Sequence, residues 1–323
     1  MSDISMSGKE QAEISRTTGI TVFGKTINIK NYKCSINGGC YKEKNKPVKL
    51  QLAICPTFYC GGHCPFCSVA GRTGRKEFLD LNKLEKALKE MHDLNMVRGI
   101  SLTGGEPFTD VVLLNEIVEM IFDIFGIEME ISINTNGSGL KKLHEIKRYE
   151  FIDAIHISRH HYDDDRNRAY FDIDVASGNE IREIVNGVSD PKLFVYNCLL
   201  LKDGIGTKEE MAQFLEFVGG TGVPKVGFVT PMPVNDYVKN NKVSYTDIFD
   251  RSDDRFLFTT CYKDYEYCHC CDGVYATKTG KLVEFYGRET IRDAKDYSRG
   301  LVYGPDNILR TGFSEDAGVV AVM

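Results

Sequence analysis

Apolar residues gather in six short runs between residues 48 and 231, and more polar segments separate these runs. Each run has the length of a buried strand, and most are rich in valine, isoleucine and leucine, as expected for strands covered on both faces. The strands predicted in this way cover residues 48–54, 98–103, 128–134, 151–158, 193–200 and 225–230.

The segments between these strands repeat their apolar residues every three or four positions, which is typical of helices with one buried face. Two helices are predicted to begin at capping boxes, Ser177 with Glu180 and Thr207 with Glu210. The buried faces predicted for the first three helices are Leu81, Leu84, Leu88, Met91 and Leu94 in 80–96, then Leu113, Leu114, Ile117, Ile121 and Phe125, then Leu140, Leu143 and Ile146 in a shorter helix.

Strand and helix therefore alternate in six units of roughly 30 residues, the spacing of βαβ units in a parallel sheet. Because a closed barrel needs eight such units, the sequence predicts an α/β fold with an open, partial (β/α)6 TIM-like barrel over 48–235. Residues 1–47 form an N-terminal extension with a small hairpin near 20–29, and 236–323 form a small cysteine-rich C-terminal module. In such a sheet the chemistry lies in the loops after the strands.

Composition narrows the class of protein. The chain has 323 residues, of which 42% are hydrophobic, so a sizeable core is available. The formal net charge of −6 argues against a nucleic-acid partner. No apolar run reaches the length of a membrane span, and the N-terminus lacks the apolar core of a secretory signal, so a cytoplasmic location is expected.

The chain contains 11 cysteines, and in a reducing compartment metal ligation explains them better than disulfides do. Cys60, Cys64 and Cys67 follow the first strand in a tight loop of glycine and proline. Three thiolates at this spacing can converge on one iron–sulfur cube and leave its fourth iron open to a small molecule. The alternatives are a zinc loop completed by His63 or Cys55, or three unrelated buried thiols.

Glycine and asparagine residues follow the next two strands. Gly104 and Gly105 leave their backbone uncovered, so either a ligand approaches closely there or the pair forms an ordinary turn. Pro107 holds Glu106 extended and fixes where its carboxylate points. The segment 134–137 offers two amides that bond a ribose or a carboxylate, or else forms an Asn-Gly turn.

Three further features leave alternatives open. Phe66 stacks on an adenine, packs under the cysteine loop, or does both. Asn197 lies in a strand of apolar neighbours, so its amide is satisfied by the backbone or turned toward a ligand. The acidic run 163–165 after His160 and His161 is interpreted as a solvated loop, with a metal site as the alternative.

The pattern Cys60-x3-Cys64-x2-Cys67, with aromatic Phe66 before the last cysteine, resembles the signature of the radical S-adenosylmethionine (SAM) superfamily. The resemblance implies a 4Fe-4S cluster on these three cysteines and SAM bound to the loops that follow the strands. The SAM-binding residues implied in this way are Phe66, Gly104, Gly105, Glu106, Pro107, Asn134, Asn136, Ser158, Asn197 and Met232, of which Asn197 and Met232 resemble the molybdenum-cofactor GTP cyclase branch in particular.

The resemblance also implies the reaction. A radical SAM enzyme cleaves SAM reductively to a 5′-deoxyadenosyl radical, which abstracts hydrogen from a substrate. The cluster then needs an electron donor of the flavodoxin or ferredoxin type. The substrate is expected to be a peptide or a small metabolite that undergoes oxidation, cross-linking or rearrangement.

A second group of cysteines lies near the C-terminus, just before a hairpin expected at 274–285. Cys261, Cys268, Cys270 and Cys271 indicate a second metal site and resemble the auxiliary-cluster ("twitch" or "SPASM") extensions of radical SAM enzymes. Adjacent Cys270 and Cys271 are not expected to bind the same metal. Zinc or plain thiols are the alternatives, and whether Cys34 and Cys40 contribute is left open.

Two rival functions remain at this point. One is an activating enzyme that generates a glycyl radical on a partner protein. The other, from a different class, is a non-catalytic iron–sulfur or zinc-binding protein. GTP is not assigned as the substrate, because the sequence ends without the Gly-Gly tail of the GTP cyclases.

Overall fold

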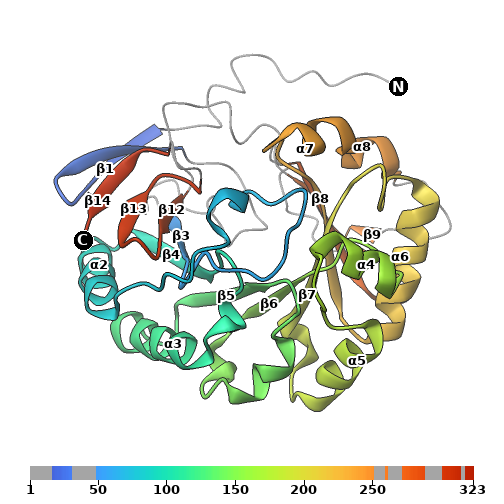
Figure 1. Cartoon of the computed structure of the whole chain (residues 1–323), viewed down its shortest axis with the longest axis horizontal. Helices are drawn as coiled ribbons and strands as arrows, with labels where there is room; N and C mark the ends of the chain where they lie inside the picture. Colours follow the sequence, from blue (N-terminus) through green and yellow to red (C-terminus); the bar gives the residue numbers. More distant parts are fainter. Residues whose placement is uncertain (1–16, 31–48, 251–258, 261–270, 288–299, 314–316) are drawn as a thin grey trace.

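The computed structural model describes residues 17–30, 49–250, 259–260, 271–287, 300–313 and 317–323 (Figure 1). Within these residues, most strands belong to one curved sheet, whose order is β14-β13-β12-β3-β4-β5-β6-β7-β8-β11-β10-β9. A separate hairpin pairs β1 (Thr17–Val22) with β2 (Lys25–Lys30) through a turn at Phe23 and Gly24, both of which have positive φ. The hairpin expected near 20–29 is therefore confirmed.

The six strands predicted from the apolar runs form the centre of the large sheet. They follow one another in chain order, and each is parallel to the next. A curved parallel sheet of this kind confirms the predicted partial barrel. The strands are β3 (Leu50–Ile54), β4 (Val97–Leu102), β5 (Glu130–Thr135), β6 (Ala154–Ser158), β7 (Phe194–Leu199) and β8 (Lys225–Thr230).

Strands from the C-terminal part of the chain extend both edges of this sheet. On one edge β11 (Leu282–Gly287) pairs in parallel with β8 and continues to β10 (Cys271–Ala276) and β9 (Thr259–Thr260). On the other edge β12 (Gly300–Tyr303) pairs in parallel with β3 and is followed by β13 (Ile308–Arg310) and β14 (Val319–Val322). The hairpin expected at 274–285 is present as β10 and β11, whereas the domain boundary at 235 remains a prediction.

Helices α2 (Leu81–Asp93), α3 (Val111–Phe125), α5 (Gly178–Gly187) and α6 (Lys208–Thr221) lie along the outer face of the sheet (Figure 1). Both predicted capping boxes are formed, at the starts of α5 and α6. The short helix expected around Leu140 is instead the 3-10 helix η3 (Leu140–Glu145), because the chain becomes extended at Ile146 after six residues. The remaining short elements are η1 (Ala70–Arg72), η2 (Pro107–Thr109), η4 (Tyr149–Phe151), η5 (Pro191–Leu193), α7 (Asp236–Asn241) and α8 (Tyr245–Ile248).

The acidic run after β6 is a helix, so its interpretation as a solvated loop was wrong. Asp163 caps the N-terminus of α4 (Asp164–Phe171), and its carboxylate accepts the backbone N–H of Arg166 at 2.9 Å. Carboxylates in the first turn of a helix are stabilised by the unpaired N–H groups and by the helix dipole. The acidic residues therefore start a helix here.

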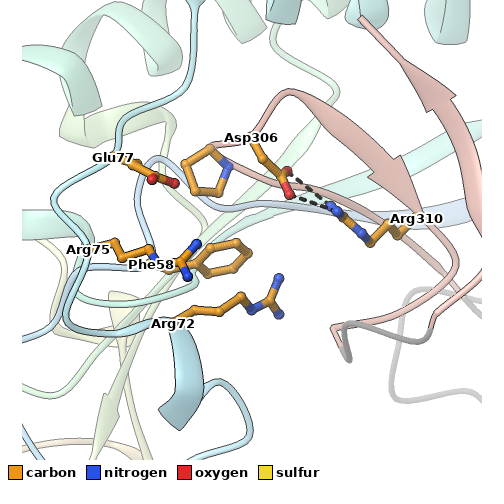
Figure 2. Close-up of a pocket in the computed structure, with 7 residues that line it drawn as sticks. Phe58, Arg72, Arg75, Glu77, Asp306 and Arg310 are labelled. Atoms are coloured by element: carbon orange, nitrogen blue, oxygen red, sulfur yellow. Dashed lines mark hydrogen bonds and ion pairs between the residues drawn. The ribbon is translucent and has the colours of Figure 1, made fainter.

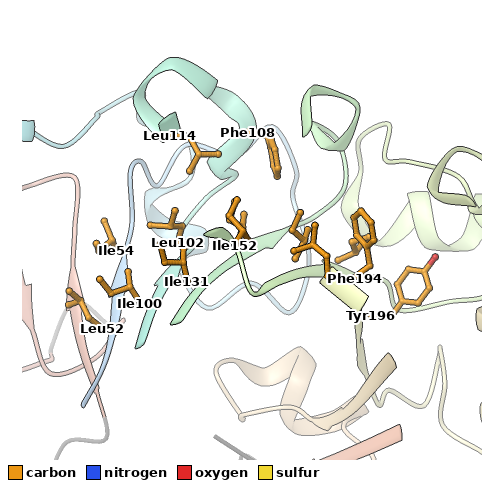
Figure 3. Packing of buried hydrophobic residues seen from close by; sticks show 14 of the residues in the cluster. Leu52, Ile54, Ile100, Leu102, Phe108, Leu114, Ile131, Ile152, Phe194 and Tyr196 are labelled. Atoms are coloured by element: carbon orange, nitrogen blue, oxygen red, sulfur yellow. The ribbon is translucent and has the colours of Figure 1, made fainter. Parts of the chain in front are cut away.

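The two faces of the sheet differ in polarity. Apolar side chains such as Ile100, Leu102 and Ile131 pack between the sheet and the outer helices and are fully or almost fully buried (Figure 3). The alternate positions point the other way, because successive side chains of a strand lie on opposite faces. These inner positions include Ser101, Ser132, Asn134, His156, Ser158 and Asn197, which the strand register places beside one another. The concave face of the barrel is therefore polar.

No helix in the described segments combines the length and the hydrophobicity needed to cross a membrane.

Candidate metal and cofactor site

The three cysteines of the predicted cluster loop lie directly after β3 and are half-buried. Burial raises the pKa of all three thiols. For Cys64, burial together with the nearby Cys67 and Cys60 raises the pKa to about 12. Ionisation of one of these thiols therefore disfavours ionisation of its neighbours. Bound iron would supply the positive charge that three neighbouring thiolates lack.

The donor set fits a cluster better than a single metal ion. Within the described part of the chain, no three His, Cys, Asp or Glu side chains gather closely enough to hold one ion. His63 is 74% exposed and lies 3.5 Å from Asp172, while Cys55 is fully buried. Neither completes a tetrahedral zinc site. A cube attaches each thiolate to a different iron, so its ligands are spaced more widely than those of one zinc ion.

Other loops of the barrel hold the cysteine loop in place. The carbonyl oxygen of Phe171, at the end of α4, accepts the N–H of His63 at 2.9 Å. A Cβ on Gly62 would lie 2.7 Å from the same oxygen, so only glycine fits there. From the loop after β8, the side chain of Asn235 donates to the carbonyl oxygen of Pro65 at 2.8 Å. The cysteine loop is therefore fixed by contacts with two distant segments.

Phe66 packs beneath the loop. Its ring meets His160 edge-on at 4.7 Å between centroids, and Phe171 and Tyr170 lie close by. His160 is buried, and burial lowers its pKa to about 3, so the ring is neutral and its Nδ1 accepts the N–H of Leu199 at 3.1 Å. The packing interpretation of Phe66 is confirmed, while its stacking on adenine remains a prediction.

The glycines of the Gly-Gly-Glu-Pro turn face the cysteine loop. A Cβ on Gly105 would lie 2.1 Å from the carbonyl oxygen of Tyr59, and Gly104 has a φ of +111°. The N–H groups of Gly105 and Glu106 donate to the carbonyl oxygens of Thr57 and Tyr59 at 2.9 and 3.0 Å. The protein's own backbone thus makes the close approach that these glycines permit; a contact of Gly104 and Gly105 with SAM remains a prediction.

The carboxylate of Glu106 is also directed inward. It is buried and accepts hydrogen bonds from the N–H of Phe108, the hydroxyl of Thr135 and the N–H of Asn136, at 3.1, 2.9 and 2.8 Å. Burial raises its pKa to about 7, although these hydrogen bonds act in the opposite direction. Glu106 and Pro107, which begins η2, therefore join the loops after β4 and β5; a contact with SAM remains a prediction.

The asparagine loop after β5 reaches the first cysteine. The side-chain amide of Asn136 donates to Sγ of Cys60 at 3.4 Å, and the N–H of Gly62 donates to the same sulfur. Asn134 bonds the hydroxyl of Ser101 at 2.6 Å across the inner face. Of the two asparagines, only Asn136 contacts the cysteine loop among the described residues.

The other predicted SAM contacts lie along the inner face and above it. Ser158 and Asn197 are register partners on β6 and β7, and both are half-buried. A Cβ on Gly227 would lie 3.3 Å from Oδ1 of Asn197 and 2.9 Å from the ring of Tyr286, so these groups form one continuous surface. Met232 is half-buried just after β8.

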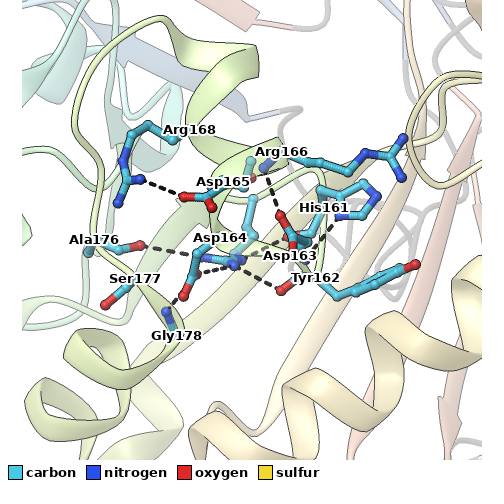
Figure 4. Close-up of polar contacts among 12 residues, drawn as sticks. His161, Tyr162, Asp163, Asp164, Asp165, Arg166, Arg168, Ala176, Ser177 and Gly178 are labelled. Atoms are coloured by element: carbon cyan, nitrogen blue, oxygen red, sulfur yellow. Dashed lines mark hydrogen bonds and ion pairs between the residues drawn. The ribbon is translucent and has the colours of Figure 1, made fainter.

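Two charged groups lie outside the residues predicted to bind SAM or metal. The guanidinium of Arg159 is buried and donates to the carbonyl oxygens of His161, Tyr162 and Ala176 and, at 2.5 Å, to Asp164. Asp164 also accepts the N–H of Gly178, so these contacts hold α4 against the start of α5 (Figure 4). This is a structural role. A basic side chain at the end of a buried strand, with an acidic residue five positions later, was the available signal.

The second group is an ion pair on the inner face of the barrel. The carboxylate of Glu284 is buried and lies 2.5 Å from Nζ of Lys225, and the hydroxyl of Tyr286 also bonds to it. A single acid within the apolar run 282–285 was the signal for this pair, because a buried charge needs a partner.

Most of the second cysteine group lies outside the described residues. This applies to Cys261, Cys268 and Cys270, and equally to Cys34 and Cys40. Cys271 begins β10, and the structure describes its backbone but not its side chain. The second metal site therefore remains a prediction.

A family comparison identifies the cysteine loop. The profile described as "Radical SAM superfamily" matches residues 54–216, just over half of the chain. The chain belongs to the radical SAM superfamily. Members of this superfamily are enzymes that use a 4Fe-4S cluster and SAM, so the alternative of a non-catalytic metal-binding protein is set aside.

Curated relatives of this chain are named as GTP cyclases. A "Probable GTP 3′,8-cyclase" of Thermococcus kodakarensis is 29% identical over 188 residues, which are 56% of this chain and 57% of that protein. The GTP 3′,8-cyclase of Lactiplantibacillus plantarum is 29% identical over 236 residues, 68% of this chain and 63% of that protein. The chain therefore spans less than two thirds of the length of these relatives.

A solved structure confirms the fold. Streptococcus suis SuiB bound to S-adenosylmethionine superposes with a TM-score of 0.53 at 15% identity, over 84% of this chain and 63% of that one.

Proposed function

We propose that Cys60, Cys64 and Cys67 hold a 4Fe-4S cluster, and that SAM and a peptide or small metabolite bind inside the barrel. The reaction is an oxidation, cross-link or rearrangement that begins with removal of a hydrogen atom from the substrate. The placement of three half-buried cysteines in one loop after β3, at the mouth of the partial barrel and bonded through Cys60 to the loop after β5, is the observation that supports this proposal most directly.

When bound, the cluster and SAM supply a strongly reducing electron and a primary carbon radical. The chain's own residues position and shield them. Phe66, His160 and Phe171 pack against one another under the cysteine loop and exclude water from below. Asn136 and Gly62 donate hydrogen bonds to the sulfur of Cys60 and stabilise it as a thiolate.

We assign SAM to the polar groups above and along the inner face. The amide of Asn197 and the hydroxyl of Ser158 are neighbours there and offer a donor and acceptors to ribose hydroxyls. Met232 contributes an apolar contact from the loop after β8. The adjoining loops are shaped by Gly104, Gly105, Glu106, Pro107 and Asn134. Hydrogen bonds from Phe108, Thr135 and Asn136 hold Glu106 in place.

An auxiliary cluster on the C-terminal cysteines is part of the proposal. Cys261, Cys268 and one of the pair Cys270 and Cys271 are its ligands, and it accepts an electron from the substrate radical. Iron analysis tests this assignment, because one cube contributes four irons per chain and two cubes contribute eight. The first electron comes from a flavodoxin or ferredoxin.

GTP is a second candidate substrate, favoured by the curated relatives, which are named as GTP 3′,8-cyclases. The polar inner face suits a nucleotide as well as a peptide backbone. Comparing the rate of SAM cleavage with and without GTP distinguishes the two: stimulation and loss of GTP favour cyclisation, whereas an unchanged rate favours the first proposal.

The decisive experiment measures 5′-deoxyadenosine formed from SAM by anaerobic protein with dithionite. Cys60→Ala, Cys64→Ala and Cys67→Ala are each expected to abolish the product and to lower the iron content by the four irons of this cluster, while the iron of an auxiliary cluster is retained. Cys198→Ala is the matched control, because Cys198 is fully buried on the outer side of β7 and away from the cysteine loop. Product formation by any of the three loop variants would contradict the proposal.

A further inference from the structure

A cavity of about 240 Å³ opens between two parts of the chain (Figure 2). One is the segment 58–77, which includes the cysteine loop, and the other is the turn that joins β12 to β13. Phe58 and Arg72 form one wall, and the guanidinium of Arg72 lies 3.9 Å from the centre of the Phe58 ring. Arg75 and Glu77 lie at its opening, and both are exposed. Asp306 and Arg310 close the opposite side.

The cavity wall leads directly to a predicted cluster ligand. Phe58 belongs to a small apolar cluster with Cys55 and Val69, and Cys67 packs against this cluster. A continuous path of packed side chains therefore connects solvent with the sulfur of Cys67.

The surface around the cavity carries excess positive charge, although the chain as a whole has a net charge of −6. Asp306 is neutralised by Arg310, which binds it through two hydrogen bonds of 3.0 and 2.7 Å. Among the described residues of the cavity and its rim, this leaves Arg72, Arg75 and the neighbouring Lys76 against Glu77 and Asp80, whose backbone N–H donates to the side chain of Asn307 in the same turn. A local positive patch on an acidic protein attracts an acidic partner and steers its approach.

We propose that this patch is the docking surface of an acidic protein that carries one electron, and that the electron reaches the cluster past Phe58 and Cys67. The proposal rests on the cluster assigned under the proposed function. In each encounter the carrier is oxidised by one electron and the cluster is reduced by one electron, and no group or proton is transferred. Charge complementarity and the short packed path favour this partner.

Binding of an acidic flavodoxin to the full chain tests the proposal without requiring catalysis. Arg75→Glu is expected to weaken the affinity measured by surface plasmon resonance about fivefold at low salt, and Glu77→Lys to strengthen it. Both effects should shrink at high salt because the charges are exposed. Arg182→Glu and Glu183→Lys on the exposed side of α5 are matched controls that should leave the affinity unchanged.

Activity then separates this proposal from the proposed function. Arg75→Glu should slow 5′-deoxyadenosine formation driven by reduced flavodoxin and leave the rate with dithionite unchanged. If Arg75→Glu and Glu77→Lys bind flavodoxin as the α5 controls do, or if both shift the affinity in the same direction, the docking surface is wrong. If the unaltered protein forms no product with dithionite, the proposed function fails, whatever the binding result.

Discussion

The side-chain amide of Asn136 donates a hydrogen bond of 3.4 Å to the sulfur of Cys60. The backbone N–H of Asn136 in turn donates to the buried carboxylate of Glu106 at 2.8 Å. Three loops, which follow β3, β4 and β5, are thus connected in series through two residues. The position of the first cluster ligand depends on a carboxylate that lies 46 positions later in the chain and makes no contact with the sulfur itself.

Asn136→Asp removes the N–H donor to Cys60 and keeps the oxygen that accepts the N–H of Ser138 at 2.8 Å. Hydrogen bonds to cluster sulfurs stabilise the reduced, more negative state. We expect a lower reduction potential in an EPR-monitored titration and about tenfold slower SAM cleavage. Asn134→Asp is the control, because its amide bonds Ser101 instead. Equal potentials in the two variants would contradict this role of Asn136.

Gly105→Ala places a methyl group 2.1 Å from the carbonyl oxygen of Tyr59, so the cysteine loop must move. Overpacking of this kind costs about 1–3 kcal/mol, and we expect the variant to bind less iron as well. Gly219→Ala, in α6 with open space around the new methyl group, should gain about 0.5–1 kcal/mol. Urea unfolding and iron analysis measure both. Normal iron content in Gly105→Ala would show that the two loops can separate without loss of the site.

The strands and most helices could be predicted because their signal is local. In β5 the buried residues Ile131 and Ile133 alternate with Ser132 and Asn134, and this alternation indicates both the strand and its polar inner face. The cysteine spacing is equally local. α4 was missed because a run of aspartates has poor helix propensity, and only the cap formed by Asp163 reveals where the helix starts.

The contacts that complete the site connect residues far apart in sequence, and no local pattern encodes them. The partner of Gly105 is the backbone near Tyr59, and the partner of Glu284 is Lys225. A glycine pair alone does not reveal whether a ligand or another loop approaches it. The role of Glu106 could not be read for the same reason. The N–H of Phe108 is a local donor, but Thr135 and Asn136 reach the carboxylate only through the packing of β4 against β5.

Glu106→Gln tests the buried carboxylate. In Glu106 both side-chain oxygens accept hydrogen bonds, whereas in glutamine one of them is replaced by an NH2 group that cannot accept. At least one donor then loses its partner, which costs about 1–3 kcal/mol. Burial raises the pKa of Glu106 to about 7 from the model-compound value of 4.5, so the stability linked to its proton is present below pH 4.5 and is lost as pH rises through about 7. The variant should lack this decline in unfolding free energy.

Glu180→Gln provides a control of opposite sign. A hydrogen bond from Lys141 lowers the pKa of Glu180 to about 2, so its contribution is present above pH 4.5 and is lost as pH falls toward 2. If urea unfolding shows the same pH dependence in both variants, Glu106 is not the buried titrating group that the structure indicates.

His160 gives a pH dependence opposite to that of Glu106. Burial lowers its pKa to about 3 from 6.5, so the unfolded chain binds a proton that the folded chain excludes. The unfolding free energy should therefore fall as pH decreases from 6.5 toward 3, by up to about 1.4 kcal/mol per pH unit. His160→Phe keeps a ring against Phe66 and Phe171 and removes the titration, so the decline should be smaller.

The same variant leaves the N–H of Leu199 without its acceptor, which lowers the stability at every pH by about 1–3 kcal/mol. The two effects separate because only the lost titration changes the slope with pH. His144→Phe makes the same replacement at an exposed position of η3 and serves as the control for the change of side chain itself. If the His160→Phe slope equals that of wild type, the acid sensitivity of the fold comes from other groups, and the ring under the cluster loop accepts a proton without unfolding the protein.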